Sequence, residues 1–105
     1  MKVRKKPVEV DAVQFVGVRT DPSGENPMLR FHDIEPMPEW LYAAISDGAV
    51  HVAGDFSDNI AVSTMEGVME APPGAWIIRG VKGELYPCDD GIFRATYDLP
   101  PEPAP

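Results

Sequence analysis

The sequence predicts an α+β domain, a small, mainly antiparallel sheet of about five strands with one amphipathic helix packed on one face. Two observations predict this class. Short β-type runs separated by turns that contain Gly or Pro fill the second half of the chain. A single apolar stripe at helical spacing runs from Trp40 to Ile45, directly after Pro38. The length of 105 residues and the hydrophobic fraction of 44% fit a single globular domain over residues 1–98.

The first half of the chain predicts a strand, a loop and the helix. Residues 8–16 alternate at first and then become apolar on both sides, which predicts a strand that enters the interior. Residues 19–36 are rich in Pro, Gly, Asp and Asn and predict a long surface loop. Within this loop, residues 28–31 fit a short strand or an anchor on the body. Pro38 is suited to the first turn of the helix, and Gly48 is suited to its end.

The second half predicts strands joined by turns. Strands are expected over 49–53, 60–64, 68–71, 76–79 and 84–87, with tight turns at 65–67 and 80–83. Asp89 and Asp90 are suited to cap one helical turn over 92–95. Residues 99–105 are rich in proline, which cannot pair inside a sheet, so they predict a disordered tail.

The charge is distributed unevenly along the chain. The formal net charge is −8, and four of the nine basic residues are Lys2, Arg4, Lys5 and Lys6, ahead of all 17 acids. Such an acidic body repels phosphate backbones, so we expect no general nucleic-acid binding. No apolar run is long enough to span a bilayer, and a single cysteine cannot form an internal disulfide. These features predict a cytoplasmic protein without membrane association.

The best candidate for a ligand site is the turn between the last two strands. Its candidate residues are Trp76, Arg79, Gly80, Lys82, Gly83 and Tyr86. The glycines would let backbone N–H groups approach an anion, the two cations would add charge, and the two aromatics would offer a stacking surface for a base. The spacing is not that of a P-loop. In the alternative interpretation, the glycines frame a hairpin turn and the aromatics are core or cross-strand partners.

The sequence carries only weak signals for catalysis or metal binding, and we predict no catalytic residue, metal or cofactor. Cys88 adjoins Asp89 and Asp90, and negative charge raises the pKa of a thiol and opposes formation of the thiolate. His32, His51 and the nearby acids lack the spacing of metal ligands. The sequence therefore predicts a protein that is not an enzyme.

Two runs of the chain carry a resemblance to a known family. Residues 1–15 read MKVRKKPVEVDAVQF, and residues 73–88 read PGAWIIRGVKGELYPC. They are similar to the start and to the C-terminal signature of a family of small, uncharacterised proteins of tailed bacteriophages and prophages. The chain departs from the family pattern at Ala75, where an acid is typical, and at residues 89–91. The resemblance implies a viral protein made in the host cytoplasm, and it implies no activity.

Three functions remain as hypotheses. The first is a non-enzymatic phage accessory protein that binds a host or phage protein. The second is a protein that binds or sequesters a small anionic ligand of nucleotide type at the turn Arg79–Gly83, and the third is a minor virion or assembly component. A short sheet with one helix leaves a face or an edge uncovered, and a symmetric homodimer would cover it.

Overall fold

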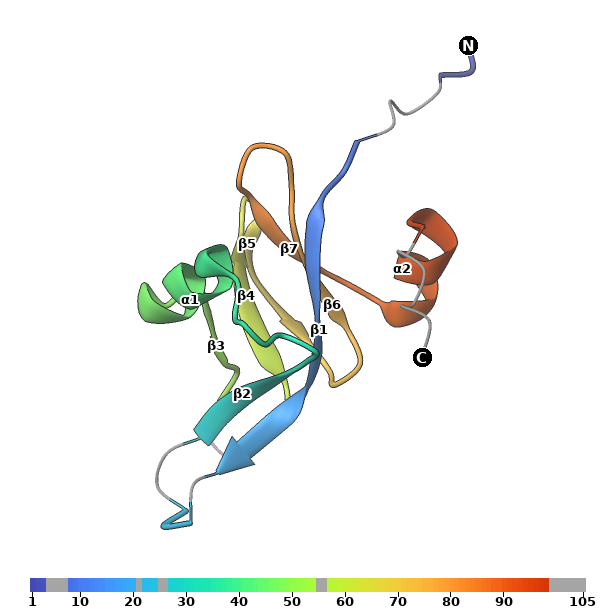
Figure 1. The fold of residues 1–105 in the computed structure, drawn as a ribbon. Helices are drawn as coiled ribbons and strands as arrows, with labels where there is room; N and C mark the ends of the chain where they lie inside the picture. Colours follow the sequence, from blue (N-terminus) through green and yellow to red (C-terminus); the bar gives the residue numbers. More distant parts are fainter. Residues whose placement is uncertain (4–7, 21, 25–26, 55–56, 99–105) are drawn as a thin grey trace.

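The computed structural model describes residues 1–3, 8–20, 22–24, 27–54 and 57–98. In these ranges, two antiparallel sheets and two helices form an α+β fold (Figure 1), which confirms the predicted class. One sheet has the strand order β2-β1-β6-β7, and the other has the order β3-β4-β5. The described part therefore contains seven strands in two sheets, whereas the sequence predicted about five strands in one.

The elements have the following bounds. The strands are β1 (Asp11–Thr20), β2 (Pro27–His32), β3 (Val50–Val52), β4 (Ile60–Thr64), β5 (Gly67–Ala71), β6 (Trp76–Arg79) and β7 (Leu85–Cys88), and the helices are α1 (Glu39–Ser46) and α2 (Asp90–Thr96). The two predicted tight turns join β4 to β5 and β6 to β7. Gly67 in the first of them has φ +113°, a conformation that favours glycine.

The stretch predicted as a long loop over 19–36 is in large part a hairpin. β1 continues to Thr20, β2 begins at Pro27, and the two strands pair antiparallel. The expected short strand over 28–31 is therefore present, and it is longer than predicted. The loop prediction was wrong because β2 has only six residues, so the turn-forming residues on either side of it dominate the composition of 19–36. The predicted tail over 99–105 lies outside the described residues.

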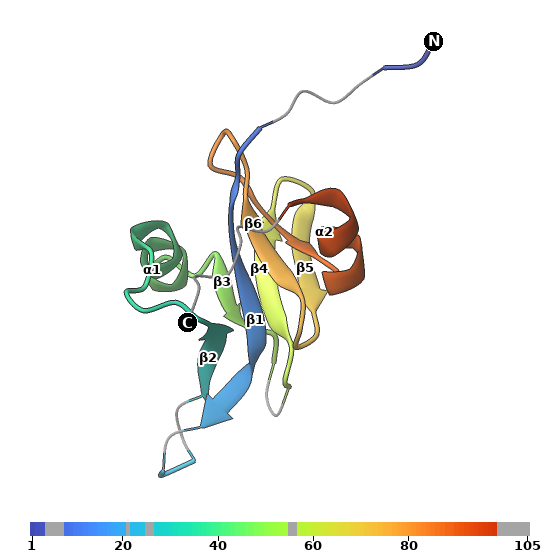
Figure 2. The same cartoon turned by 45° about the vertical axis from the view of Figure 1, so that its right-hand side comes forward.

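One hydrophobic core lies between the two sheets and α1. Its buried members are Val13, Phe15, Leu41, Ala44, Val50, Ile60, Val62, Ala71, Ala75 and Ile77. α1 begins after Pro38 and buries Leu41 and Ala44, and the half-buried Trp40 packs against the same core. This helix thus packs on one face as predicted, and it lies at the opposite side of the molecule from α2 (Figure 2).

α2 covers the outer face of the four-stranded sheet (Figures 1 and 2). Successive side chains of a strand point to opposite faces, so Ile77 faces the core while Trp76 and Ile78 face α2. Phe93 of α2 is 3% exposed and stacks on Trp76, with ring centroids 4.1 Å apart. The helix is longer than the single turn predicted, and Asp89 caps it by accepting a hydrogen bond from the N–H of Ile92.

Candidate functional site

The predicted ligand-binding turn connects β6 to β7, and its polar groups bond to one another. The N–H of Gly80 donates to the carbonyl of Glu84 at 2.8 Å, and the N–H of Gly83 donates to the carbonyl of Gly80 at 3.0 Å. The carboxylate of Glu84 accepts the N–H of Lys82 at 2.9 Å. A carboxylate of the chain itself therefore already bonds to the backbone amide that would approach an anion.

Arg79 lies beside this turn and faces an acid. Its Nη1 is 3.4 Å from Oδ2 of Asp11. Arg79 and Gly83 also line a hollow of about 540 Å³ between α1, the β4–β5 turn and the β6–β7 turn. Among the described residues that line this hollow, the charged side chains are those of Arg79, Asp47 and Glu84. Two carboxylates and one cation that already faces an acid do not favour a negatively charged ligand there.

Trp76 and Tyr86 lie on the opposite face of the sheet from Arg79. In the β6–β7 register, Tyr86 is opposite Ile78, on the face that α2 covers. The hydroxyl of Tyr86 is 3.2 Å from that of Tyr97. Burial raises the pKa of Tyr86 most, and the hydrogen bond to Tyr97 raises it further. The structure therefore brings the two aromatics to one face and Arg79 to the other, so the six predicted residues do not share one pocket.

Removal of the Glu84 carboxylate is expected to expose an anion-binding amide that the native turn conceals. In Glu84→Ala, the N–H of Lys82 loses its acceptor, so a titration with inorganic phosphate should shift the amide resonances of Lys82 and Gly83. The native chain should show little shift at these amides under the same conditions, as measured by ¹H–¹⁵N correlation spectra. Comparable shifts in the native chain would contradict this prediction and would support the nucleotide-type hypothesis.

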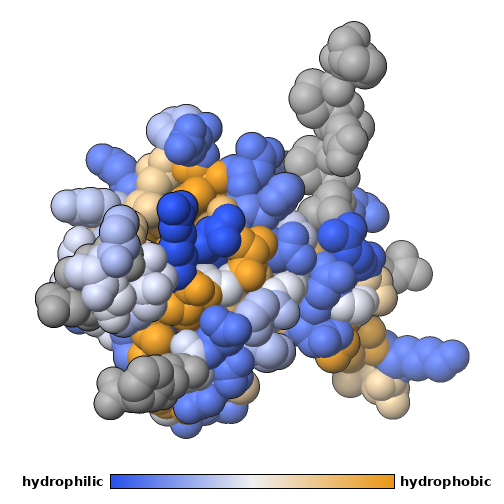
Figure 3. All heavy atoms as spheres, turned by 90° about the horizontal axis from the view of Figure 1, so that it is seen from below, coloured by the Kyte–Doolittle hydropathy of each residue, from blue (hydrophilic) through white to orange (hydrophobic). Residues whose placement is uncertain are grey.

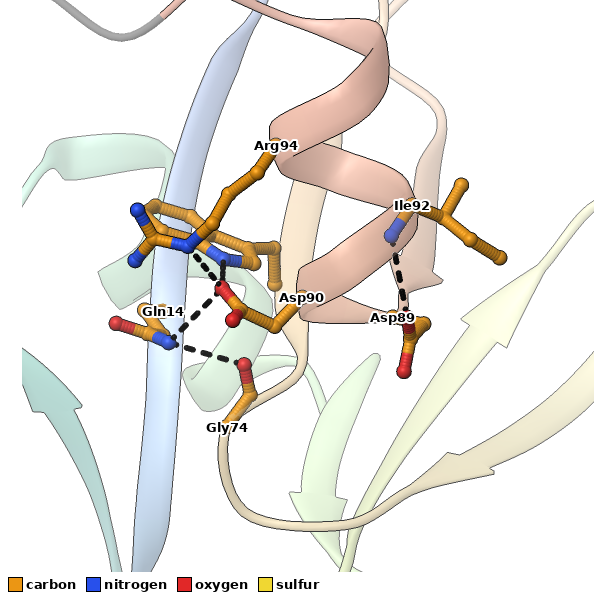
Figure 4. Close-up of polar contacts among 7 residues, drawn as sticks. Gln14, Gly74, Asp89, Asp90, Ile92 and Arg94 are labelled. Carbon is orange, nitrogen blue, oxygen red and sulfur yellow. Dashed lines mark hydrogen bonds and ion pairs between the residues drawn. The ribbon is translucent and has the colours of Figure 1, made fainter.

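Asp90 joins three elements through one carboxylate oxygen (Figure 4). Its Oδ1 accepts hydrogen bonds from Trp76 Nε1 at 2.8 Å, from Arg94 Nε at 2.9 Å and from Gln14 Nε2 at 3.5 Å. Gln14 Nε2 also donates to the carbonyl of Gly74 at 3.0 Å. The hydrogen bond from Trp76 lowers the pKa of Asp90 most. Desolvation opposes this shift, and the hydrogen bond and the positive charge of Arg94 lower the pKa further. Asp90 was expected only to cap the helix, although its i,i+4 spacing to Arg94 is a sequence signal for this ion pair.

The lowered pKa of Asp90 predicts that acid weakens the contact between α2 and the sheet. A carboxylate with a lowered pKa stabilises the folded state above the pKa of the unfolded chain, and this contribution is lost as the pH falls through the folded value. We therefore expect the fluorescence of Trp76 to change below about pH 4, the ordinary range of an aspartate. The variant Asp90→Asn, studied in a Trp40→Phe background, should lack this transition. An unchanged transition in that variant would assign it to other groups.

A groove of about 1060 Å³ runs along the start of β1, beyond the point where β2 ends. One wall carries Trp76, Phe93 and Tyr97 from the α2 side. The other wall is the segment from His32 to Pro38, which leaves the sheet after β2 with Asp33 in the left-handed region at φ +52°. The floor is the stretch of chain from Val8 to Gln14.

The backbone edge of β1 is open inside this groove. β1 pairs with β6 over Asp11–Gln14, but it pairs with β2 only from Gln14 onward. In an antiparallel strand, backbone groups of alternate residues point to opposite edges. The N–H and C=O of Phe15 bond to Ala75 and Gly74 at the β6 end, so those of Ala12 point toward the groove. Within the described part, β6 pairs with β1 on one edge at Ala12, and no strand pairs with the other edge there.

The described lining of the groove is acidic, and one of its walls carries aromatic side chains. Among the described residues that line it, the charged ones are Glu9, Asp11, Asp33 and Asp98, and Asp11 already faces Arg79. All four are acids, so the groove favours a positively charged occupant. Elsewhere, exposed apolar side chains are spread over several places, and the face in Figure 3 shows apolar patches separated by hydrophilic side chains. The groove is therefore the feature that combines shape, an open backbone edge and a uniform charge.

Cys88 and His51 do not line the groove, whereas His32 does. Burial, and then the charge of Asp89, raises the pKa of the Cys88 thiol, in the direction that the sequence predicted. His51 Nδ1 lies 3.1 Å from the carbonyl of Gly48, and His32 stands at the edge of the groove. Within the described ranges, no three His, Cys, Asp or Glu side chains gather in a way that could hold a metal ion. Asp55, one of the acids that follow His51 in the sequence, lies outside the described residues.

Two further observations bear on the site. Neither helix of the described part has the length and apolar character needed to cross a bilayer. Comparison with known proteins finds no family model, no curated protein and no solved structure that matches this chain. The resemblance to phage proteins thus stays a prediction, and the function must be argued from the geometry.

Proposed function

We propose that the protein is a binding module that takes an extended, positively charged segment of another protein into the groove along β1. The observation that carries this proposal is the open edge of β1 at Ala12, which lies within a groove whose charged residues, among those that the structure describes, are acidic. An extended peptide that joins a sheet edge gains main-chain hydrogen bonds, and pockets on either side select its side chains.

The two walls of the groove indicate which side chains such a segment would carry. Alternate side chains of an added strand would point to opposite faces of the four-stranded sheet. On one face they would meet Trp76 and Tyr97, which suit apolar groups or the stems of lysine and arginine. On the other face they would lie beside Glu9 and Asp33, which suit cationic groups. A segment with alternating apolar and basic residues fits both.

This proposal develops the first of the three functions. The resemblance to small phage proteins supports an accessory protein that acts in the host cytoplasm, and it makes a host or phage protein the partner. The proposal assigns no reaction to the chain. The virion hypothesis makes a separate prediction, since a structural component would be found by mass spectrometry of purified particles.

The direct test uses short peptides of opposite charge. A peptide that alternates valine with lysine should perturb the amide resonance of Ala12 and the indole N–H of Trp76. A peptide that alternates valine with glutamate is the matched control and should leave both unchanged. Equal responses to the two peptides, or responses centred on the β6–β7 turn, would refute the proposed function.

A further inference from the structure

We infer that the occupant of the β1 groove is the free N-terminus of a partner protein, which runs antiparallel to β1 and places its terminal ammonium group beside Asp33. This inference rests on the proposed ability of the groove to accept a basic extended segment. It adds the direction of that segment, and it names the end of the partner chain that enters the groove.

The open edge of β1 is closed at one end by β2. Gln14 is opposite His32 in the β1–β2 register, so β2 occupies this edge of β1 from Gln14 onward. An added strand can therefore use the edge only at Ala12 and toward the start of the chain. At the level of Gln14 such a strand meets His32 and Asp33, which both line the groove.

The direction of the added segment decides which of its ends meets β2. β2 is antiparallel to β1. A segment that is also antiparallel to β1 runs in the direction of β2 and begins where β2 ends, so its N-terminus lies beside Asp33. The strand pairs of the described part are all antiparallel, and this pairing is slightly more stable per residue than parallel pairing.

The charge at the closed end favours an ammonium group. Asp33 is exposed, lines the groove, and makes no hydrogen bond or ion pair with another residue of the described part. Asp11, in contrast, already faces Arg79. A terminal ammonium group would meet an opposite charge at Asp33, whereas the terminal carboxylate of a parallel segment would meet a like charge.

The backbone of β1 offers an acceptor to the same ammonium group. The N–H and C=O of Ala12 point toward the groove, because those of Phe15 bond at the β6 side. The residue of the segment opposite Ala12 would donate its own N–H to the carbonyl of Ala12. If that residue is the first of the partner, the donor is the ammonium group, which has enough N–H donors to bond to Asp33 as well.

An internal segment of a partner fits the closed end less well. Its chain would have to continue beyond the residue opposite Ala12, toward the edge of Gln14 that His32 already occupies. It would therefore have to turn out of the groove at once, and it would bring no positive backbone charge to Asp33. A chain that begins opposite Ala12 needs no such turn.

The register also indicates which side chains the first two residues would carry. Residues two apart on a strand share a face, so Ala12 lies on the face of Gln14, which is opposite Trp76. The first residue of the partner would point to this face, where Trp76 and Tyr97 line the groove and favour an apolar side chain. The second residue would point to the other face and would be opposite Asp11, which favours a basic side chain.

The decisive experiment compares one peptide with two blocked forms of it. The probe is a six-residue peptide that begins with valine and alternates valine with lysine, titrated into the isotopically labelled full chain. N-terminal acetylation should raise the dissociation constant, measured from the amide shift of Ala12, roughly tenfold, because it removes the ammonium charge. C-terminal amidation should not weaken binding. Equal affinities of the free and the acetylated peptide overturn the inference.

A matched pair of variants locates the terminal ammonium group. Asp33→Asn removes the charge at the closed end, and asparagine tolerates the φ of +52° at this position. Glu35→Gln removes the same charge from the same segment, at a residue that does not line the groove. Asp33→Asn should abolish the difference between the free and the acetylated peptide, and Glu35→Gln should preserve it. Equal behaviour of the two variants would show a general effect of charge and would overturn the inference.

The direction of the peptide is tested with a nitroxide label. A label attached through a thioether to the second residue of the peptide should broaden the amide resonance of Asp33 more strongly than that of Glu9. A label on the last residue should broaden that of Glu9 more strongly. The reverse pattern would show a parallel segment and would overturn the inference.

Failure of this inference can be distinguished from failure of the proposed function. If the free and the acetylated peptide shift the resonance of Ala12 equally, the recognition of a free N-terminus is wrong and the groove function stands. If neither peptide shifts that resonance, both are wrong.

Discussion

Replacement of Phe93 with alanine is expected to release α2 from the sheet and to lower the free energy of unfolding by about 3 kcal/mol. Phe93 is 3% exposed, and its ring stacks on Trp76 at a centroid distance of 4.1 Å and an interplanar angle of 12°. The same ring contacts Tyr97 at 5.0 Å. Alanine would remove the side chain that holds the helix against Trp76, and it would leave a cavity under a helix of only seven residues.

Urea denaturation and the fluorescence of Trp76 in a Trp40→Phe background would measure this change. Phe93→Leu is the control, because it keeps most of the buried volume and should cost less than Phe93→Ala. The loss should be local, so amide exchange should increase in α2 and much less in β4. A variant that retains slow exchange in α2 would show that the hydrogen bonds of Asp90 hold the helix without the stack.

Replacement of Phe15 with alanine should have a larger effect, about 4 kcal/mol or more, and should affect the whole domain. Phe15 is completely buried at the centre of the core, and its ring meets Phe31 of β2 edge to face at 6.0 Å. Its backbone also bonds to Gly74 and Ala75, so β1 is anchored to the β6 end at the same residue. The cavity would lie between both sheets, where no single element can move to fill it.

Calorimetry and amide exchange distinguish this outcome from that of Phe93→Ala. Because small domains are stable by roughly 5–15 kcal/mol, the Phe15 variant should lose a large share of its stability and unfold at a much lower temperature. Phe15→Leu is the volume-conserving control and should recover part of the loss. A loss for Phe15→Ala that is no larger than the loss for Phe93→Ala would contradict the view of a single core centred on β1.

Local signals were sufficient for part of the fold. Pro38 and Gly48 bracket α1 closely, and Gly67 marks the β4–β5 turn, because each of these residues acts through its own backbone conformation. The division into two sheets was not predictable in this way. It depends on which strands meet, and β1 meets β6 across more than half of the chain.

The same contrast between local signals and long-range contacts applies to the candidate site. The turn Arg79–Gly83 was predicted as a turn, yet strand alternation alone would have placed Trp76 and Arg79 on opposite faces, and this signal was overlooked. The bond from Lys82 to the carboxylate of Glu84 depends on side-chain geometry that spacing does not specify. The groove was not predictable from the sequence, because it lies beside the first residues of β1, with which β2 does not pair.

The division of β1 between two partners has a consequence for how the chain folds as it is synthesised. Asp11 leaves the ribosome early, but its contact Arg79 is 68 residues further along the chain. Closing so large a loop is slow compared with the formation of the local hairpins. During that interval the local hairpin with β2 covers one edge of β1 from Gln14 onward, while the edge that β6 will pair with stays open to other chains.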